Sequence, residues 1–208
     1  MNGPRIVTLR HVDGELELRL RQYSALSFWH CVRADVRGYR GVRVAASTVG
    51  FWAVLSYRAA SSLRRSGLDF LAIIVQVMAQ LVFGCEISRK AIVGPSLVIV
   101  HPIGVFIGPH CLLGRGCTVE TGAFIGSNQS PADPDDYPTL DDKVAVATGA
   151  RIMGPVVIGR ESRLGPNVVV LRSVPPGSIV MPPAPRIVSR DQLFGRAAGA
   201  ASDSQGDS

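Results

Sequence analysis

Histidine is the residue type in this chain best suited to moving a proton near neutral pH, because its unperturbed pKa lies closest to that range. The sequence of 208 residues contains four histidines, and His101 is the one that falls where a repetitive segment is interrupted. Two interpretations follow from this placement alone. His101 is either a general base for a reacting hydroxyl group, or a core histidine whose ring bonds the backbone.

The repetitive segment runs from Glu86 to Val174 with a period of six residues. A helix requires apolar spacings of three and four, and a flat strand requires strict alternation, so neither fits this period. Short strands separated by corners and stacked turn upon turn do fit it, which predicts a β-helix. The aliphatic residues that recur are Ile87, Val93, Ile99, Ile107, Leu113, Val119, Ile125, Leu140, Val146, Ile152, Ile158, Leu164 and Val170.

The repeat is interrupted twice. A step of eight residues follows Ile99 and contains His101, and a step of fifteen follows Ile125 and sets aside a polar loop at 127–138. Insertions in repeat proteins tend to lie on the binding face, and loops on a rigid frame often carry function. Both interruptions are therefore predicted to contribute to a functional site, with a purely connecting surface loop as the alternative.

The net charge of +6 comes from residues 1–84, while residues 85–208 are balanced. Such a basic half could attract an anionic partner, although solvated helix faces are the favoured explanation. Nucleic-acid binding is not predicted, because no motif or aromatic series accompanies the charge. The uncharged stretch 70–84 has 15 residues, fewer than the roughly 20 that cross a bilayer. We expect a helix buried between the N-terminal region and the repeat, with membrane contact at most peripheral.

Cysteine usage predicts reduced interior thiols. Cys111 and Cys117 occupy small inward positions of neighbouring repeats, and free cysteine packs as a small hydrophobic residue. The sequence has no CxxC motif and no secretory signal, so a cytoplasmic location is the default expectation.

Three parts are expected along the chain: a helical N-terminal region at 1–84, a β-helix at 85–190, and a disordered polar tail at 191–208. Residues 1–13 are expected to be extended or frayed. Apolar spacing and glycine stops predict helices over 15–37, 51–65 and 69–82.

The six-residue period resembles that of the hexapeptide-repeat acyltransferases, whose left-handed β-helix uses three repeats per triangular coil. At that count the thirteen repeats imply about four coils. Within this group the serine acetyltransferases are the closer match, and the similarity extends over most of the chain. The similar segments are Arg33–Val36, Phe51–Arg58, His101–Gly108, Gly149–Gly154 and Val174–Pro176.

The resemblance implies that His101 is the general base, which accepts the proton of a hydroxyl group as that group attacks the thioester of acetyl-CoA. It places a carboxylate fifteen residues earlier, at Glu86, to orient the imidazole and favour the imidazolium. It also implies Asp35 as a carboxylate for the amino group of the substrate. The expected function is acetyl-CoA-dependent O-acetyl transfer to a small hydroxyl acceptor, serine or a related compound.

Acceptor recognition departs from the family pattern. Asp136 and Tyr137 stand where the family's loop has arginine and histidine, of which the arginine holds the serine carboxylate, and Val100 replaces an acidic residue just before the catalytic histidine. An acid in place of a carboxylate-binding arginine reverses the electrostatics. These differences favour a neutral or amine-bearing hydroxyl compound, or a sugar hydroxyl, over L-serine.

The resemblance further implies that coenzyme A binds between neighbouring subunits of a trimer or a dimer of trimers. The candidate contacts are Gly126, Thr148, Gly149, Arg163 and Arg186. No metal is expected: a metal-dependent carbonic anhydrase on the same prism needs a histidine cluster, and His101 and His110 have no third partner in the repeats. His110 is predicted to face solvent at a corner. A sugar or polysaccharide O-acetyltransferase and a non-catalytic scaffold remain as alternatives.

Overall fold

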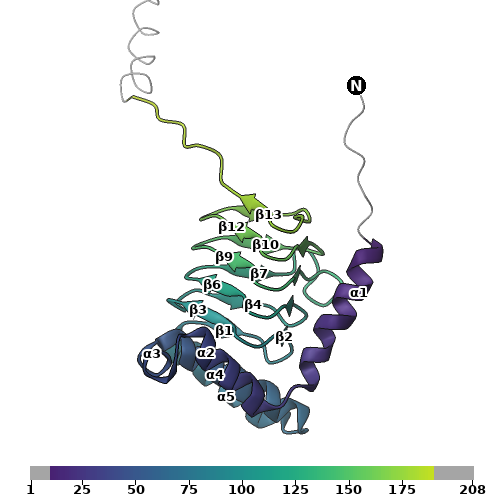
Figure 1. The fold of residues 1–208 in the computed structure, drawn as a ribbon, viewed down its shortest axis with the longest axis vertical. Coiled ribbons are helices and arrows are strands. Elements are labelled where there is room, and N and C mark those ends of the chain that lie inside the picture. The colour runs from purple at the N-terminus through teal and green to yellow at the C-terminus, as the bar shows by residue number, and fades with distance from the viewer. Residues whose placement is uncertain (1–9, 190–208) are drawn as a thin grey trace, which may run out of the picture.

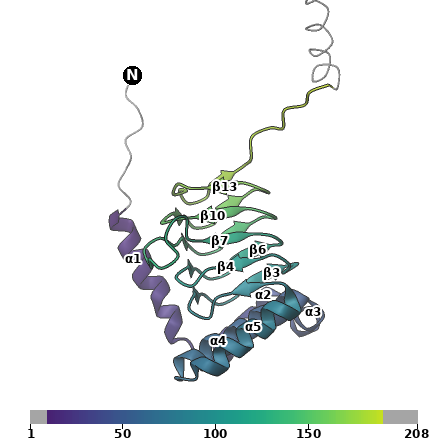
Figure 2. The ribbon, with the colours of Figure 1, turned by 180° about the vertical axis from the view of Figure 1, so that it is seen from behind.

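The computed structural model describes residues 10–189, in which a three-sided prism of short parallel strands stands on a layer of helices (Figure 1). Seen from behind, α1 (Arg10–Arg21) runs alongside the prism, while the other helices lie at its lower end (Figure 2). The tail predicted to be disordered, 191–208, lies outside the described residues. The prediction of an extended or frayed segment at 1–13 is wrong for its last residues, because α1 begins at Arg10.

Each strand of the prism has two or three residues. The strands are β1 (Glu86–Ile87), β2 (Ile92–Val93), β3 (Val98–Val100), β4 (Phe106–Ile107), β5 (Leu112–Leu113), β6 (Thr118–Glu120), β7 (Phe124–Gly126), β8 (Thr139–Leu140), β9 (Ala145–Val146), β10 (Arg151–Met153), β11 (Val157–Ile158), β12 (Arg163–Leu164), β13 (Val169–Val170) and β14 (Ile179–Val180).

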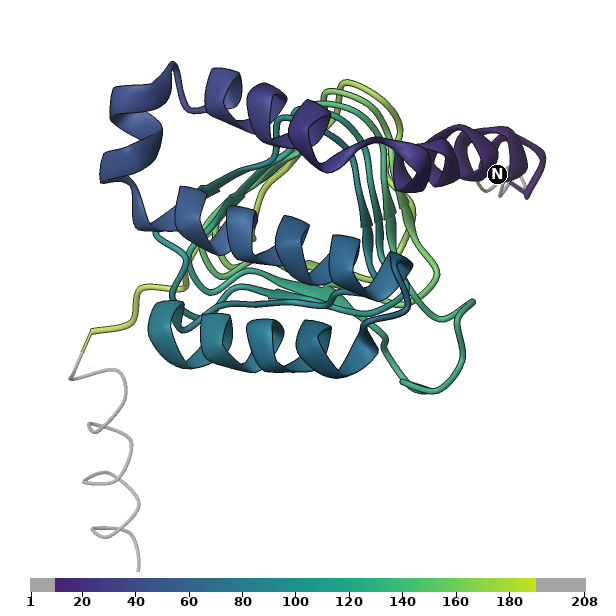
Figure 3. The same cartoon turned by 90° about the horizontal axis from the view of Figure 1, so that it is seen from below.

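Successive strands pass from one sheet to the next, which is the topology of the predicted left-handed β-helix. We call the sheets side A (β1-β4-β7-β10-β13), side B (β2-β5-β8-β11) and side C (β3-β6-β9-β12-β14). Viewed from below, the three sides enclose a triangle (Figure 3). The prediction of about four coils is too low, since sides A and C each contain five strands. The difference arises at β14, which pairs with β12 although the surrounding chain is rich in proline.

The predicted inward aliphatic residues form the core of the prism. On side A they pair in parallel register from Ile87 through Ile107 and Ile125 to Ile152 and Val170, and all of these side chains are buried. Stacking brings neighbouring coils into backbone contact, which explains the small residues that follow the aliphatic ones.

One local contact illustrates this close stacking of the coils. A Cβ atom on Gly114 would lie 2.5 Å from the backbone nitrogen of Asp142 in the next coil. Cys111 and Cys117 are buried free thiols, as predicted, and burial raises the pKa of Cys117 to about 12.

The N-terminal region contains more helical segments than the sequence predicts. They are α1, the 3-10 helix η1 (Gln22–Ala25), α2 (Phe28–Gly38), α3 (Val42–Ser47), α4 (Val49–Arg65) and α5 (Asp69–Phe83). The single helix predicted over 15–37 is wrong, because the chain becomes extended at Leu26 and Ser27. The Ser27 hydroxyl then accepts a hydrogen bond from the backbone N–H of His30 and caps α2. The predictions of α4 and α5 are confirmed, and Gly84 ends α5 in the left-handed conformation.

The composition of α5 predicted a helix buried between the N-terminal region and the prism. This prediction is wrong. Helix α4 takes that place and buries Ala53, Val54 and Tyr57 against the first coil. Helix α5 packs beside α4 and β1 (Figure 3), and only Ala72 of its residues is buried. Among the helices of residues 10–189, none is long and apolar enough to cross a membrane.

Candidate active site

One vertical edge of the prism, where side C turns into side A, holds His101. The turn 101–105 stacks on the start of β1, because Gly104 N–H donates to Gly84 O at 2.7 Å and Glu86 N–H donates to Val105 O at 2.9 Å. The same edge continues upward through Thr121, whose hydroxyl donates to Ile103 O at 2.8 Å. We call this column of turns the C–A edge.

The interrupted repeat gives His101 a backbone conformation that the higher coils lack. Each higher turn of the C–A edge has one residue with positive φ: Gly122 at 68°, Gly149 at 69° and Asn167 at 56°. The first turn has two, Gly104 at 74° and His101 at 54°. Left-handed residues such as Ser96, Lys143 and Glu161 also occur where side B turns into side C, so the conformation belongs to the corners of this fold, and the second such residue in one turn is what departs from it. The step from Ile99 to Ile107 is two residues longer than a regular repeat, and this extra length separates the exposed His101 from the regular column.

Glu86 lies at the start of β1, opposite Phe106 in the register of side A. The stacked turn therefore brings Glu86 and His101 to the same edge of the first coil. Glu86 is half-buried and His101 is exposed. Neither side chain forms a hydrogen bond within the described part of the chain, so the expected contact between the two is not made in this conformation.

The position before His101 is occupied by Val100, which is 36% exposed at the end of β3. Its partner in the next coil is Glu120, an acidic residue that the sequence analysis did not single out. Glu120 accepts hydrogen bonds from the backbone N–H and the hydroxyl of Thr148, at 3.1 and 2.9 Å. Thr148, a predicted coenzyme A contact, is thus held on the C–A edge.

Asp35 is buried in this structure and does not face solvent. Its side chain is 1% exposed and accepts hydrogen bonds from Arg58 Nε at 2.9 Å and Nη2 at 3.1 Å. It also accepts one from the backbone N–H of Leu97 at 3.1 Å. Burial acts to lower the pKa of Arg58, but Asp35 raises it, and the net direction is upward. The pair therefore stays charged and attaches α2 and α4 to the first coil.

The loop 127–138 leaves the opposite edge of side A, where side A turns into side B. Asp136 organises it from within, because its Oδ2 atom accepts hydrogen bonds from the Ser127 hydroxyl at 2.6 Å and from the backbone N–H groups of residues 128–130. The bond from Ser127, followed by those from the backbone, lowers the pKa of Asp136 to about 2. The loop therefore carries a fixed negative charge at neutral pH.

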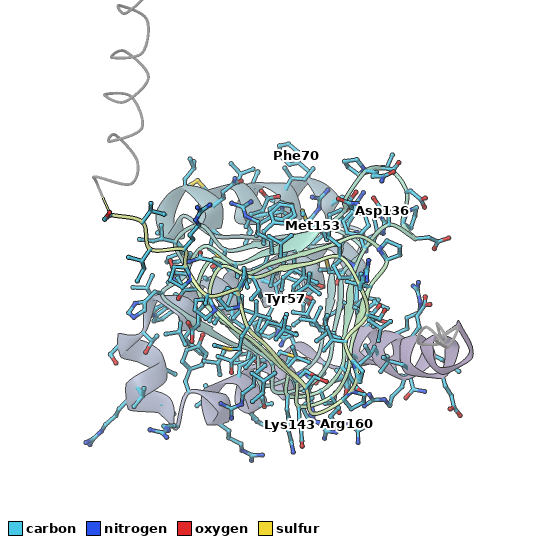
Figure 4. All side chains as sticks on the ribbon, turned by 90° about the horizontal axis from the view of Figure 1, so that it is seen from above. Tyr57, Phe70, Asp136, Lys143, Met153 and Arg160 are labelled. Atoms are coloured by element: carbon cyan, nitrogen blue, oxygen red, sulfur yellow. The ribbon has the colours of Figure 1, made fainter. Side chains whose placement is uncertain are left out.

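Tyr137 is buried at the base of this loop. Its hydroxyl donates to Pro131 O at 2.8 Å, and its ring lies edge-on to His110 with centroids 5.1 Å apart. His110 was predicted to face solvent. In the structure this contact leaves it half-buried. Seen from above, Asp136 and Met153 lie on the side of the prism that α5 and Phe70 flank (Figure 4). Within one chain, the loop and His101 occupy different edges.

The predicted coenzyme A contacts are distributed over two sides and the exit of the prism. Gly126 ends β7 on side A, where an added Cβ atom would lie 3.1 Å from the Phe106 and Phe124 rings, so packing alone already favours glycine there. Gly149 follows Thr148 on the C–A edge. The exposed residues Arg163 and Arg186 lie on β12 of side C and in the segment after β14. Between residues 10 and 189, no three histidine, cysteine or acidic side chains meet as metal ligands.

Comparisons with known proteins agree with this architecture, although no protein-family model matches the chain. A serine acetyltransferase of Mycobacterium tuberculosis is 30% identical over 169 residues, which cover 77% of this chain and 73% of the relative. The soybean serine acetyltransferase complexed with serine superimposes with a TM-score of 0.70 at 27% identity, covering 82% of this chain and 74% of that one. The Brucella abortus serine acetyltransferase in complex with coenzyme A gives 0.68 at 25% identity, covering 77% and 67%.

The residues quoted above, the five-coil prism with its helical base, and these similarities lead to one assignment. The chain belongs to the serine acetyltransferase family.

Proposed function

We propose that the protein is an acetyl-CoA-dependent O-acetyltransferase that acts on the hydroxyl group of serine or a related small compound. The observation that carries the proposal is the placement of His101, an exposed histidine on the two residues that lengthen one turn of an otherwise regular prism. Family membership supports the same reaction, since the relatives are named serine acetyltransferases. A non-catalytic scaffold would have no need of this lengthened turn.

In the proposed reaction, His101 accepts the proton of the acceptor hydroxyl as its oxygen bonds to the acetyl carbonyl carbon. The carbon–sulfur bond then breaks, and the imidazolium returns the proton to the departing thiolate of coenzyme A. Glu86 is a positioning residue, which would rotate toward the ring when substrates fill the edge and would stabilise the imidazolium. Apo structures often leave such contacts open.

Coenzyme A is proposed to lie along the C–A edge, as a co-substrate and without a metal. The stacked turns there expose backbone beside Thr148 and Gly149, and Arg163 and Arg186 supply charges for the phosphates. The coenzyme A complex of the Brucella abortus relative supports a coenzyme A site in proteins of this architecture. A screen of hydroxyl acceptors with acetyl-CoA, following release of free thiol, tests the proposed activity. Absence of thiol release with every acceptor would favour the scaffold alternative.

We expect the protein to form a trimer, alone or as part of a dimer of trimers. Helix α5 exposes a row of apolar side chains, of which Phe70 and Leu81 are each 74% exposed, and patches of this kind mark interfaces. The loop 127–138 and His101 lie on different edges of side A, so a neighbouring copy could bring a loop to each histidine. Light scattering at micromolar concentration should give about three times the chain mass for a trimer, or about six times for a dimer of trimers.

Substitution of one exposed residue on α5 tests this interface. Leu81→Lys is expected to shift the mass toward a monomer and to lower activity, whereas Leu18→Lys on α1, equally apolar and 66% exposed, should leave both unchanged. A monomeric wild-type protein with full activity would contradict the trimer.

The acceptor loop predicts poor use of L-serine. A serine carboxylate would lack the charge-assisted hydrogen bonds of an arginine, worth about 1.5–3 kcal/mol, and it would meet the fixed charge of Asp136. Since about 1.4 kcal/mol is tenfold, we expect kcat/KM for L-serine to be roughly tens to hundreds of times lower than for the preferred acceptor. Steady-state comparison with serinol and a panel of hexoses measures this directly.

Two matched variants separate charge from loop shape. Asp136→Asn keeps an oxygen to accept the hydrogen bonds of residues 127–130 and should improve L-serine relative to serinol. Asp135→Asn makes the same change in charge on the neighbouring residue, which is exposed, and should alter the ratio less. A wild-type protein that clearly prefers L-serine would refute the loop argument and identify the protein as an ordinary serine acetyltransferase.

A further inference from the structure

A cavity of about 240 Å³ lies at the base of the prism, between η1, α2, α4 and the first coil. Its lining contains six cationic residues and no acidic one. The cations are Arg21, Arg58, Arg64, Arg65, Arg89 and Lys90. None of them belongs to the C–A edge, because Arg89 and Lys90 lie in the turn from side A to side B. The cavity is therefore separate from the proposed acyl-transfer site.

The carboxylates around the cavity neutralise only part of this charge. Arg58 is paired with Asp35, and Arg21 with Glu17. Asp69 lies 3.9 Å from both Arg64 and Arg89, but it is 62% exposed, so solvent weakens these two contacts.

Two further cations have no acidic partner. Across the described residues, no carboxylate lies within ion-pair distance of Arg65 or Lys90. Nearby His110 reports the same excess charge: burial lowers its pKa, and Lys90, Arg21 and Arg64 lower it further.

Arg89 also has an unmet hydrogen-bonding capacity. Its Nε atom is buried and makes no hydrogen bond, the only such side-chain atom found in residues 10–189, and the Asp69 carboxylate that lies 3.9 Å from this nitrogen is beyond hydrogen-bond distance. Its Nη1 atom makes only a long contact of 3.4 Å to Gln76. A buried donor without a partner is costly, and native structures rarely leave one unless a ligand or water completes it. An oxyanion is the partner that a guanidinium binds best.

We propose that this cavity binds a small oxyanion carrying two or more negative charges, such as sulfate, phosphate or a compact phosphomonoester. The volume falls below the roughly 300–1,000 Å³ of sites for drug-sized ligands, which excludes a nucleotide as the whole ligand. An extended anionic surface is also disfavoured, because the Arg89 nitrogen is enclosed. The bound anion would link η1 and α4 to the first coil. The proposal does not depend on acetyl transfer, and its test uses binding alone.

The test measures thermal unfolding and calorimetric binding of the full chain with sodium sulfate, sodium phosphate and glycerol 3-phosphate at pH 8. Sodium chloride at matched ionic strength is the reference. Specific binding stabilises the folded state in a saturable way, so a rise beyond chloride that saturates is expected. Tighter binding of the ester than of inorganic phosphate would identify a phosphomonoester as the ligand, and the reverse order would identify a free oxyanion.

Charge-neutralising variants locate the site. Arg89→Gln should weaken sulfate binding by about 10- to 100-fold, the loss of a hydrogen bond to a charged group. Lys90→Gln, on an exposed side chain that the fold does not need, should weaken it as well and serves if Arg89→Gln fails to fold. Arg172→Gln makes the same change in charge at the far end of the prism and should bind normally.

A crystal grown with selenate should show an anomalous peak beside Arg89. Three results would each overturn the proposal: no saturable effect beyond chloride, unchanged affinity in both cavity variants, or selenate found only beside Arg163 and Arg186.

Discussion

His101→Ala is expected to lower turnover by about 10²–10⁴, the usual contribution of a general base, while the fold stays intact. His101 is exposed, so its removal takes little packing from the core, although its left-handed backbone suits alanine somewhat less well than histidine. The measurement is thiol release from acetyl-CoA with the best acceptor from the screen, together with far-UV circular dichroism and the oligomer mass of the variant. His30→Ala, on the exposed face of α2, is the control for removal of a histidine and should retain full turnover.

A folded His101→Ala protein that releases thiol at nearly the normal rate would refute the mechanism. Glu86→Gln distinguishes a positioning carboxylate from an essential one. The amide keeps the size of the side chain and can still accept a hydrogen bond from the ring, so turnover should fall less than in His101→Ala. An equal loss of turnover in both variants would mean that Glu86 does more than orient the ring. Residues that act as one catalytic unit show this behaviour, because removing either one costs about as much as removing both.

The prism was predictable because its cause is local and repeated. A residue that points inward must be aliphatic in every coil, so the period of six identifies the buried positions one by one, from Ile87 to Val170. The last coil was missed because the aliphatic core residue of β14, Val180, comes ten residues after Val170 and is therefore out of phase with the repeats. Its pairing with β12 depends on the coil below, which the local sequence does not describe.

The helical base was predicted less well, for a different reason. An apolar helix such as α5 must cover its surface, but composition does not say which neighbour covers it. Within one chain the protected place beneath the prism goes to α4. The break before α2 did have a local signal, since Ser27 is a favoured N-cap residue.

The same distinction applies to the candidate site. His101 stood out because it coincides with an interruption of the period. The contact of Glu120 with Thr148 joins residues 28 positions apart, and only the stacking register brings them together. Asp35 is the reverse case: a carboxylate that the family resemblance assigned to substrate lies in a buried ion pair with Arg58, 23 residues away.

Asp35→Ala is accordingly expected to destabilise the protein by about 3–5 kcal/mol, because it leaves the buried Arg58 charge without its partner. Arg58 would keep only its hydrogen bonds to the carbonyl oxygens of Val93 and Gly94, at 2.6 and 2.7 Å. Asp35→Asn keeps the size of the side chain but not its charge, and it should lower the free energy of unfolding by much of the same amount. Denaturant titration of the free protein measures both.

Glu161→Gln is the matched control for this ion pair. It breaks the exposed pair with Lys143, for which the expected loss is only about 0–1 kcal/mol. The comparison also decides between the two roles considered for Asp35. If Asp35 held the amino group of the acceptor, Asp35→Asn would leave the free energy of unfolding near that of the wild type and would raise KM for amine-bearing acceptors alone. A buried ion pair predicts the opposite. The free energy of unfolding should fall strongly, and in the fraction that remains folded the ratio of kcat/KM for serinol to that for hexoses should equal the wild-type ratio.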